Sequence, residues 1–162
     1  MTKIDMILAD EEYRSAMAKI EYFEKDRVFC RHGLNHSLDV ARIAWIYCLE
    51  EKLPVDKEVV FAAALVHDIG RSAEYETGES HDAAGVRLFA PLLCKAGFSE
   101  REQEAICAAV AGHRQSHKDS TQADILSELL YKADKQSRLC FMCAARDSCY
   151  WDETKKNKTL DV

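Results

Sequence analysis

The chain has 162 residues, with 22 Lys and Arg side chains against 28 Asp and Glu, which gives a net charge of -6. This length lets one domain bury a substantial core without a disulfide or a metal. The negative charge opposes the counterion release that drives non-specific nucleic-acid binding, so a small molecule is the better first expectation for a ligand.

No apolar run approaches the roughly 20 residues that span a bilayer, and the N-terminus "MTKIDMILADEEY" is acidic without a long apolar segment. The seven cysteines are an odd number, and without a secretion signal we expect them to stay thiols. These features predict a soluble cytoplasmic protein that does not contact a membrane.

Apolar residues recur at three- and four-residue spacing through the first third of the chain, which is typical of amphipathic helices. They predict one helix near 9–26 and a second near 35–52. The residues that define the two patterns are Tyr13, Met17, Ile20 and Phe23, followed by Leu38, Ala41, Trp45, Cys48 and Leu49.

A third helix is predicted to begin after Asp56, which is a suitable N-cap residue. It would run through "KEVVFAAALVHD" until Gly70 ends it. Because this segment is nearly all apolar, we expect it at the centre of the fold.

Three more helices are predicted in the second half. Ser80 can cap a helix that runs to about Lys95, and the capping box "SERE" at 99–102 opens another toward Gly112. The segment "ILSELLYKADKQSRLCFMCAA" supplies the sixth and longest helix.

The polar stretches 71–79 and 114–123 are predicted to be loops. No segment shows the strict alternation of a strand, and no Gly-Ser linker divides the chain. The sequence therefore predicts an all-α fold, a compact bundle-like array of about six main helices in a single domain that covers 1–162.

Four ionisable residues interrupt apolar helical faces: His36, His67, Asp68 and Asp134. Imidazole nitrogen and carboxylate oxygen are the ligand set of Zn, Mn, Fe and similar metals, and two of each can hold one ion with positions left for water. The alternative for each residue is a hydrogen-bonded position in the core.

The order of these residues, with "HSLDVARIA", "ALVHDIG" and "YKADK" around them, resembles the HD-domain superfamily of metal-dependent phosphohydrolases. The resemblance covers about 30–138 and leaves 139–162 as a Cys-containing C-terminal extension. It implies an all-α fold and assigns His36, His67, Asp68 and Asp134 as metal ligands.

His81 and His113 resemble the additional histidines of HD proteins that carry two metals, in which Asp68 would bridge the ions. Such a site clamps both the attacking and the leaving oxygen of a phosphoryl transfer. In those proteins a second histidine usually follows directly after the one that corresponds to His113, whereas this chain has Arg114 at that position. The alternative roles of His81 and His113 are phosphate binding and helix capping.

Basic residues flank the predicted ligands: Arg31, Arg71, Arg114, Lys118 and Lys135. We expect Asp68 and Arg71 to take part in catalysis, and Arg71, Arg114 and Lys135 to bind the substrate, because cations attract phosphate oxygens. Arg71 also fits an ordinary surface loop. Arg138 lies one helical turn after Asp134 and is expected to pair with it.

The C-terminal extension contains "CFMCAARDSCYW". Its cysteines, together with one near the first predicted ligand, could bind a structural zinc: Cys30, Cys140, Cys143 and Cys149. The spacing differs from that of a zinc ribbon, and buried free cysteines acting as small apolar residues are the alternative. His32 could join this group or support the metal ligands. The polar tail "DETKKNKTLDV" is predicted to be frayed or extended.

The function implied by the resemblance is a phosphohydrolase that acts on a nucleotide or another small phosphorylated metabolite. One or two divalent transition metals per chain, Mn, Fe, Co, Ni or Zn, would activate a water molecule. Two alternatives remain. One is a non-catalytic HD-fold protein that senses a nucleotide or a metal, and the other is a di-iron oxygenase.

Overall fold

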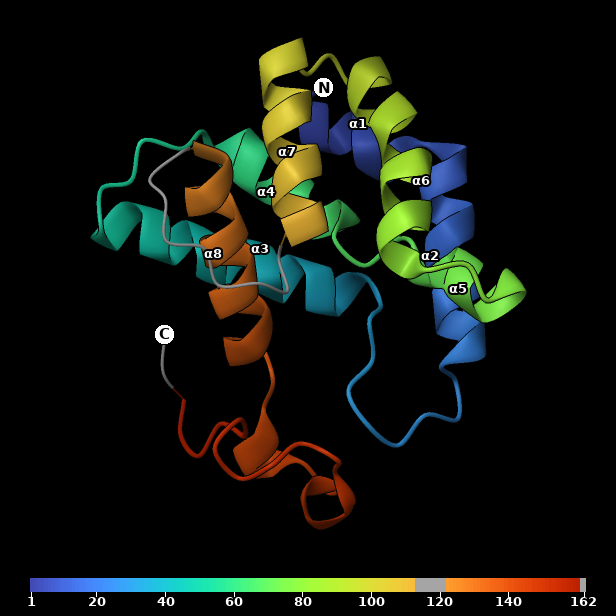
Figure 1. Ribbon diagram of the computed structural model, residues 1–162, viewed down its shortest axis with the longest axis vertical. Coiled ribbons are helices and arrows are strands. Elements are labelled where there is room, and N and C mark those ends of the chain that lie inside the picture. The colour runs from blue at the N-terminus through green and yellow to red at the C-terminus, as the bar shows by residue number, and fades with distance from the viewer. Residues whose placement is uncertain (113–121, 161–162) are drawn as a thin grey trace.

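The computed structural model describes residues 1–112 and 122–160, and within these ranges the regular elements are all helices (Figure 1). The all-α prediction is confirmed. The helices are α1 (Lys3–Ala9), α2 (Glu11–Phe23), α3 (Leu34–Glu50), α4 (Lys57–Val66), α5 (Arg71–Thr77), α6 (His81–Lys95), α7 (Glu100–Gly112) and α8 (Gln122–Gln136), with 3₁₀ turns η1 (Cys140–Met142) and η2 (Arg146–Ser148).

Helix α4 is the centre of the fold, as its apolar sequence predicts. Every residue from Ala62 to Val66 is buried, together with Val59 and Val60. The helix packs against α1, α3, α6, α7 and α8. In Figure 1 it lies between α3 and α8 on one side and α2, α5 and α6 on the other. Because most of the helix surface is buried, packing determines where the chain after Val66 leaves the core.

The predicted helix caps are mostly present. Asp56 accepts a hydrogen bond from the backbone N–H of Glu58 at the start of α4. Ser99 and Glu102 form the capping box at the start of α7. Ser80 stands at the N-cap of α6 but makes no side-chain cap bond. No helix in the described ranges has the length and apolar content needed to cross a bilayer.

The helix predicted near 9–26 is present as α2. The shorter helix α1 lies before it and was not predicted, and the two helices meet at Asp10. The Asp10 carboxylate accepts hydrogen bonds from the backbone N–H groups of Glu12 and Tyr13, so this residue ends one helix and caps the next. An N-cap carboxylate that accepts hydrogen bonds from backbone N–H groups determines where a helix begins, and the spacing of apolar residues does not show this position.

Helix α5 stands where a loop was predicted at 71–79. The chain leaves α4 through the turn 67–70 and resumes a helix at once. Only Ser72 and Ala73 of this helix are buried, so most of its residues are polar. The apolar periodicity of a helix is therefore not visible in its sequence. Gly78, with φ 75°, ends the helix in the left-handed conformation that glycine favours. The other predicted loop, 114–123, falls almost wholly outside the described residues.

Gly70 has a packing role that the sequence analysis missed. A Cβ atom built on it would lie 1.9 Å from the carbonyl oxygen of His81 and 2.6 Å from the backbone nitrogen of Gly85. Only glycine therefore lets the turn after α4 touch the backbone of α6. This contact sets the position of His81 relative to the end of α4.

Helix α8 ends at Gln136, well before the end of the predicted sixth helix. Beyond it, the extension, defined here as residues 139–160, lies below α8 in Figure 1. Asn157 Nδ2 donates to the carbonyl oxygens of Lys135 (2.8 Å) and Arg138 (2.6 Å), and so satisfies carbonyls at the end of the helix. Lys156 is buried. In the tail that was predicted to be frayed or extended, Lys156 and Asn157 are held by hydrogen bonds, whereas the other described residues from Asp152 to Leu160 are exposed.

Candidate metal centre

His67 and Asp68 lie where the buried helix α4 gives way to the turn before α5. His67 Nδ1 lies 2.6 Å from the carbonyl oxygen of Ala64. Because a carbonyl only accepts, Nδ1 carries a proton and Nε2 is the nitrogen left to bind a proton or a metal. That Nε2 lies 3.0 Å from Asp68 Oδ2. The helix end thus aims one imidazole nitrogen and one carboxylate oxygen at the same point.

His36 in the first turn of α3 and Asp134 in the last turn of α8 complete the group. His36 Nε2 lies 3.2 Å from Asp134 Oδ1 and 3.6 Å from Asp68 Oδ2. The rings of His36 and His67 have centroids 5.3 Å apart. All four residues offer a ligand atom within 4.8 Å of the others. We call His36, His67, Asp68 and Asp134 the four-residue cluster.

Ser137, which follows α8, orients the His36 ring. Its hydroxyl donates to the carbonyl oxygen of Asp134 at 2.7 Å, so its oxygen accepts from His36 Nδ1 at 3.2 Å. His36 Nε2 is then an acceptor, and Arg138 Nη2 donates to it at 3.0 Å. Both histidines therefore present Nε2 to the cluster. The sequence analysis missed Ser137. Its position three residues after Asp134, one helical turn away, is the feature that could have identified it.

Both carboxyl groups of the cluster are ionised at neutral pH although they are buried. Burial raises the pKa of Asp68, but the charge of His67 and other neighbouring donors hold it well below its usual range. Burial also raises the pKa of Asp134, whereas the adjacent His36 and the Arg138 guanidinium lower it far more. Two negative charges therefore converge in a buried place, which favours a cation between them.

Three cationic side chains that do not belong to the cluster donate hydrogen bonds to these carboxylates. Arg71 Nε donates to Asp68 Oδ1 at 2.9 Å, and Lys135 Nζ donates to Asp134 Oδ2 at 3.1 Å. Arg138 Nη2 donates to Asp134 Oδ1 at 3.1 Å, the helical pair that its spacing predicts. The structure thus places Arg71 and Lys135 at the cluster. Arg114 and Lys118 lie outside the described residues, and so does His113.

His81 is buried at the start of α6 but does not belong to the four-residue cluster. Its Nδ1 lies 3.1 Å from Glu74 Oε1, and its Nε2 lies 3.2 Å from Asp82 Oδ1. That second pair is not aligned as a hydrogen bond, so both atoms are buried without a hydrogen-bond partner among the described residues. A second metal at His81 stays a prediction.

A buried polar network lies next to the cluster. His32 Nδ1 donates to Glu24 Oε1 at 2.5 Å, and Tyr75 donates its hydroxyl to the same oxygen at 2.6 Å. Burial raises the pKa of Glu24, but these hydrogen bonds outweigh it and lower the pKa to about 2. The ring of His32 makes an edge-on contact with that of His36, with centroids 5.8 Å apart. Glu24 and Tyr75 were missed, because nothing in their spacing links them to His32.

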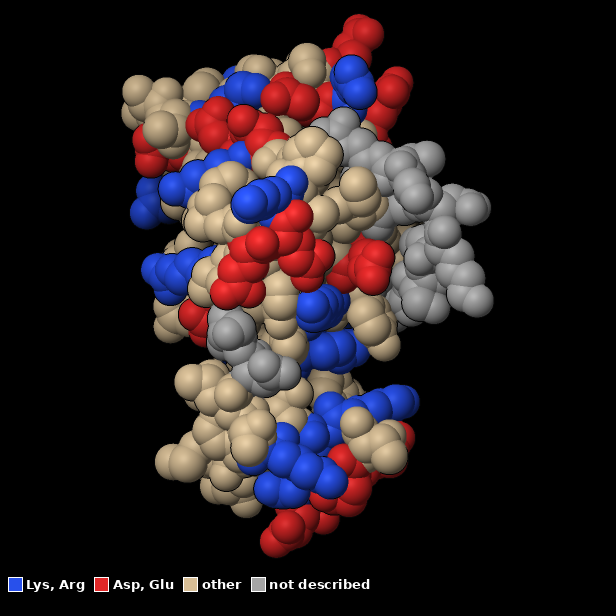
Figure 2. Space-filling model, turned by 90° about the vertical axis from the view of Figure 1, so that its left-hand side faces the viewer, with Lys and Arg blue, Asp and Glu red and all other residues tan. Residues whose placement is uncertain are grey.

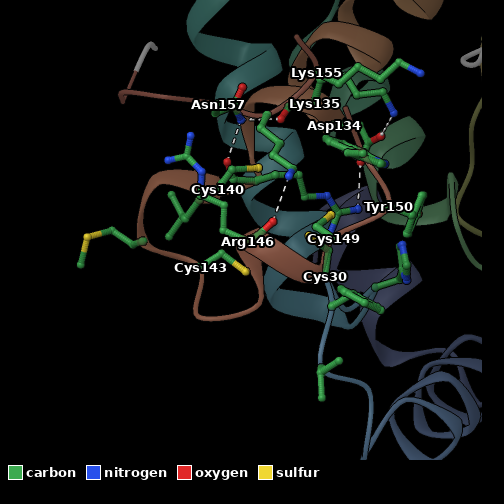
Figure 3. Close-up of a pocket in the computed structure, with 18 of the residues that line it drawn as sticks. Cys30, Asp134, Lys135, Cys140, Cys143, Arg146, Cys149, Tyr150, Lys155 and Asn157 are labelled. Carbon is green, nitrogen blue, oxygen red and sulfur yellow. Dashed lines mark hydrogen bonds and ion pairs between the residues drawn. The ribbon is translucent and has the colours of Figure 1, made fainter. Parts of the chain in front are cut away.

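A cavity of about 860 Å³ lies between the helical body and the extension. Asp134, Lys135 and Arg71 line it, so it reaches the four-residue cluster. Tyr150 and several side chains of the extension line it as well (Figure 3). The volume falls within the roughly 300–1,000 Å³ of small-molecule sites.

The structure does not support the predicted structural zinc. Cys30, Cys140, Cys143 and Cys149 all line the cavity, but within the described parts of the chain only the four-residue cluster has ligand atoms close enough to hold a metal. All four are free cysteines. Cys140 is buried, and burial raises the pKa of the Cys30 thiol, as expected for cysteines that pack as apolar residues.

Comparison with known proteins gives three findings. The model of the HD domain matches residues 33–139. A protein of Clostridium beijerinckii described as uncharacterized is 40% identical over 157 residues, 97% of each chain. A crystal structure of a predicted HD superfamily hydrolase from an uncultured Thermotogales bacterium matches with a TM-score of 0.61 and 26% identity, over 88% of this chain and 80% of that one.

More distant similarity connects the chain to part of a larger enzyme. Ribonuclease Y of Enterococcus faecalis is 32% identical over 104 residues, which are 64% of this chain and 18% of that protein. Ribonuclease Y of Lactobacillus gasseri is 30% identical over 101 residues, 16% of its length. The chain therefore spans less than a fifth of these ribonucleases.

Proposed function

The chain belongs to the HD-domain superfamily, and we propose that it is a metal-dependent phosphohydrolase acting on a nucleotide or another small phosphorylated metabolite. The observation that carries this proposal is the four-residue cluster, whose ligand atoms lie within 4.8 Å of one another beside a cavity. The solved structure of a predicted HD superfamily hydrolase supports the reaction class.

The chemistry of the cluster fits a divalent transition metal. Two imidazole nitrogens and two carboxylate oxygens are ligands that suit Mn, Fe, Co, Ni or Zn. Both histidine rings have their Nδ1 atoms engaged, by Ala64 and by Ser137, so that each Nε2 is the ring nitrogen that faces the carboxylates of the cluster. Such outer hydrogen bonds are typical of metal-binding histidines.

A divalent metal held there would activate a water molecule near neutral pH and polarise the phosphoryl oxygen. The chain itself supplies the positioning. Arg71 uses Nε for Asp68 and also lines the cavity, where its other N–H groups can bind phosphate oxygens. Lys135 also lines the cavity, and its ammonium would neutralise a second phosphate oxygen.

We extend the proposal to a second metal held by His81 and His113. The supporting observation is that His81 Nε2 and Asp82 Oδ1 are buried without a hydrogen-bond partner in the described residues. A buried nitrogen and carboxylate oxygen without donors are suited to a cation. The sequence places His113 directly after α7.

The proposal is tested by phosphate release from metal-free protein that is reconstituted with Mn²⁺ or Co²⁺. The substrates are nucleoside mono-, di- and triphosphates and dinucleotides. A short oligoribonucleotide joins them, because ribonuclease Y relatives match part of the chain. Release that requires the metal supports the proposal, and silence across the panel contradicts it. Nucleotide binding without release would favour the sensing protein, and metal-dependent oxygen consumption would favour the oxygenase.

A further inference from the structure

The extension is fixed onto the helical body although most of it lies beyond the HD-domain match at 33–139. Asn157 holds it to the end of α8 through two carbonyl oxygens. Inside the extension, Lys156 Nζ donates to the carbonyl oxygen of Arg146 at 2.9 Å and to Glu153 Oε1 at 2.8 Å. These bonds give the extension a defined surface, so it can serve as the wall of a binding site.

The charge of the cavity is opposite to that of the chain as a whole. Seven of its lining side chains are Lys or Arg, and only one, Asp134, is acidic. The chain carries a net charge of -6. Figure 2 shows Lys and Arg side chains gathered at the junction of the body with the lower part of the molecule and on that lower part. A cationic cavity in an acidic protein selects an anionic ligand.

Four aromatic residues line the same cavity, and two of them, Tyr150 and Trp151, come from the extension. Tyr150 packs edge to face on Phe29, with ring centroids 6.1 Å apart and planes at 84°. Trp151 and Tyr131 flank the ammonium of Lys135, at 5.1 Å and 5.4 Å from their ring centroids. Tyr150 is 74% exposed, so its ring is available to a ligand.

Lys135 joins the cationic and aromatic parts of this cavity. Its Nζ lies 3.1 Å from Asp134 Oδ2, in the four-residue cluster, and also lies over the two rings. A phosphate at the cluster would therefore have aromatic surface within reach. A phosphate alone is small against a cavity of about 860 Å³, so the cavity has room for an organic group attached to it.

We propose that the extension determines substrate choice: Tyr150 and Trp151 bind a planar ring that the substrate carries, while its phosphate lies against Arg71 and Lys135. The inference rests on the proposed phosphohydrolase function. Stacking on aromatic side chains suits any nucleobase, because every base has a π face. The ring-binding wall is supplied by residues that the HD-domain match does not include.

The kinetic test compares two substrates that differ only in the base, adenosine 5′-monophosphate and ribose 5-phosphate. We expect the metal-reconstituted protein to prefer the nucleotide in kcat/KM. Tyr150→Ala should reduce this preference about tenfold, mainly through a higher KM for the nucleotide. The matched control is Tyr22→Ala, because Tyr22 is likewise exposed and packs edge to face on a phenylalanine. It should keep the preference.

A binding test separates the two proposals. The indole of Trp151 reports on the cavity, and Trp151→Phe leaves Trp45 as the background signal. Without added metal, we expect adenosine 5′-monophosphate to quench wild-type fluorescence, ribose 5-phosphate to leave it unchanged, and Trp151→Phe to lose the quenching. Quenching without phosphate release would defeat the phosphohydrolase proposal and keep the ring site. Equal turnover of both substrates, with no quenching, would defeat the ring site alone.

Discussion

Gly70 and His81 are in backbone contact so close that a Cβ atom on Gly70 would lie 1.9 Å from the carbonyl oxygen of His81. The contact joins the turn that carries Asp68 to the start of α6. It therefore couples the position of the four-residue cluster to that of the buried His81.

This contact predicts that Gly70→Ala destabilises the protein by about 1–3 kcal/mol, because the added methyl group forces the two backbones apart. The measurement is urea unfolding followed by circular dichroism. Gly85→Ala is the matched control at the same interface. Its Cβ atom would meet its nearest neighbour at 3.7 Å, so the free energy of unfolding should stay equal or rise. Equal destabilisation by both variants would contradict the close contact.

Arg138 competes with a metal for the cluster, because its Nη2 donates to both His36 Nε2 and Asp134 Oδ1. Replacing it by methionine removes one positive charge next to these ligand atoms. We expect Arg138→Met to bind Mn²⁺ about tenfold more tightly. Competition with a fluorescent chelator measures the change. Arg42→Met removes an exposed arginine from the same protein and should leave the affinity unchanged. Weaker binding in Arg138→Met would refute the competition.

Glu24 should contribute stability that is lost in acid. Its pKa is about 2 in the folded protein, against an ordinary value of 4.5. A carboxyl group whose pKa is lowered in the folded protein stabilises the fold at pH values above its pKa in the unfolded state. This contribution to the free energy of unfolding disappears as the pH falls from about 4.5 toward 2. The difference in unfolding free energy between wild type and Glu24→Gln should therefore shrink from about pH 5 to about pH 3. Glu12→Gln, on the exposed face of α2, serves as the control. A difference independent of pH would rule out this role.

The second-metal proposal predicts close to two metals per wild-type chain at saturation and close to one in His81→Ala. Mass spectrometry of the metal content, on the samples used for kinetics, provides the measurement. Loss of the second ion should lower kcat more than it raises KM, because the missing charge acts mainly on the transition state. One metal in both proteins, with a higher KM in His81→Ala, would instead make His81 a phosphate-binding residue.

The sequence was sufficient to predict the all-α fold and the central position of α4, and its resemblance to the HD-domain superfamily implied the four residues that the structure brings together. The residue types also single these four out, because ionisable residues on apolar helical faces are rare. His36, His67 and Asp134 stand at helix ends that packing against α4 brings together.

Features that depend on contacts between distant segments escaped the sequence analysis. The end of α8 depends on Asn157, which binds its last carbonyls from the far side of the extension. The hydrogen bond from His32 to Glu24 and the contact of Gly70 with α6 also join residues with no periodic relation. Helix α5 was missed because its exposed face is polar, so its periodicity is weak.

Metal-dependent phosphate release by wild type and Asp68→Ala tests the central claim most directly. Asp68 is buried, and its two oxygens contact both cluster histidines and Arg71. We predict release by wild type with Mn²⁺, a loss of at least about 100-fold in Asp68→Ala, and normal release by Asp39→Ala, whose carboxylate is exposed on α3. Helical circular dichroism should be similar in all three proteins. Release by a folded Asp68→Ala at the wild-type rate would contradict the account.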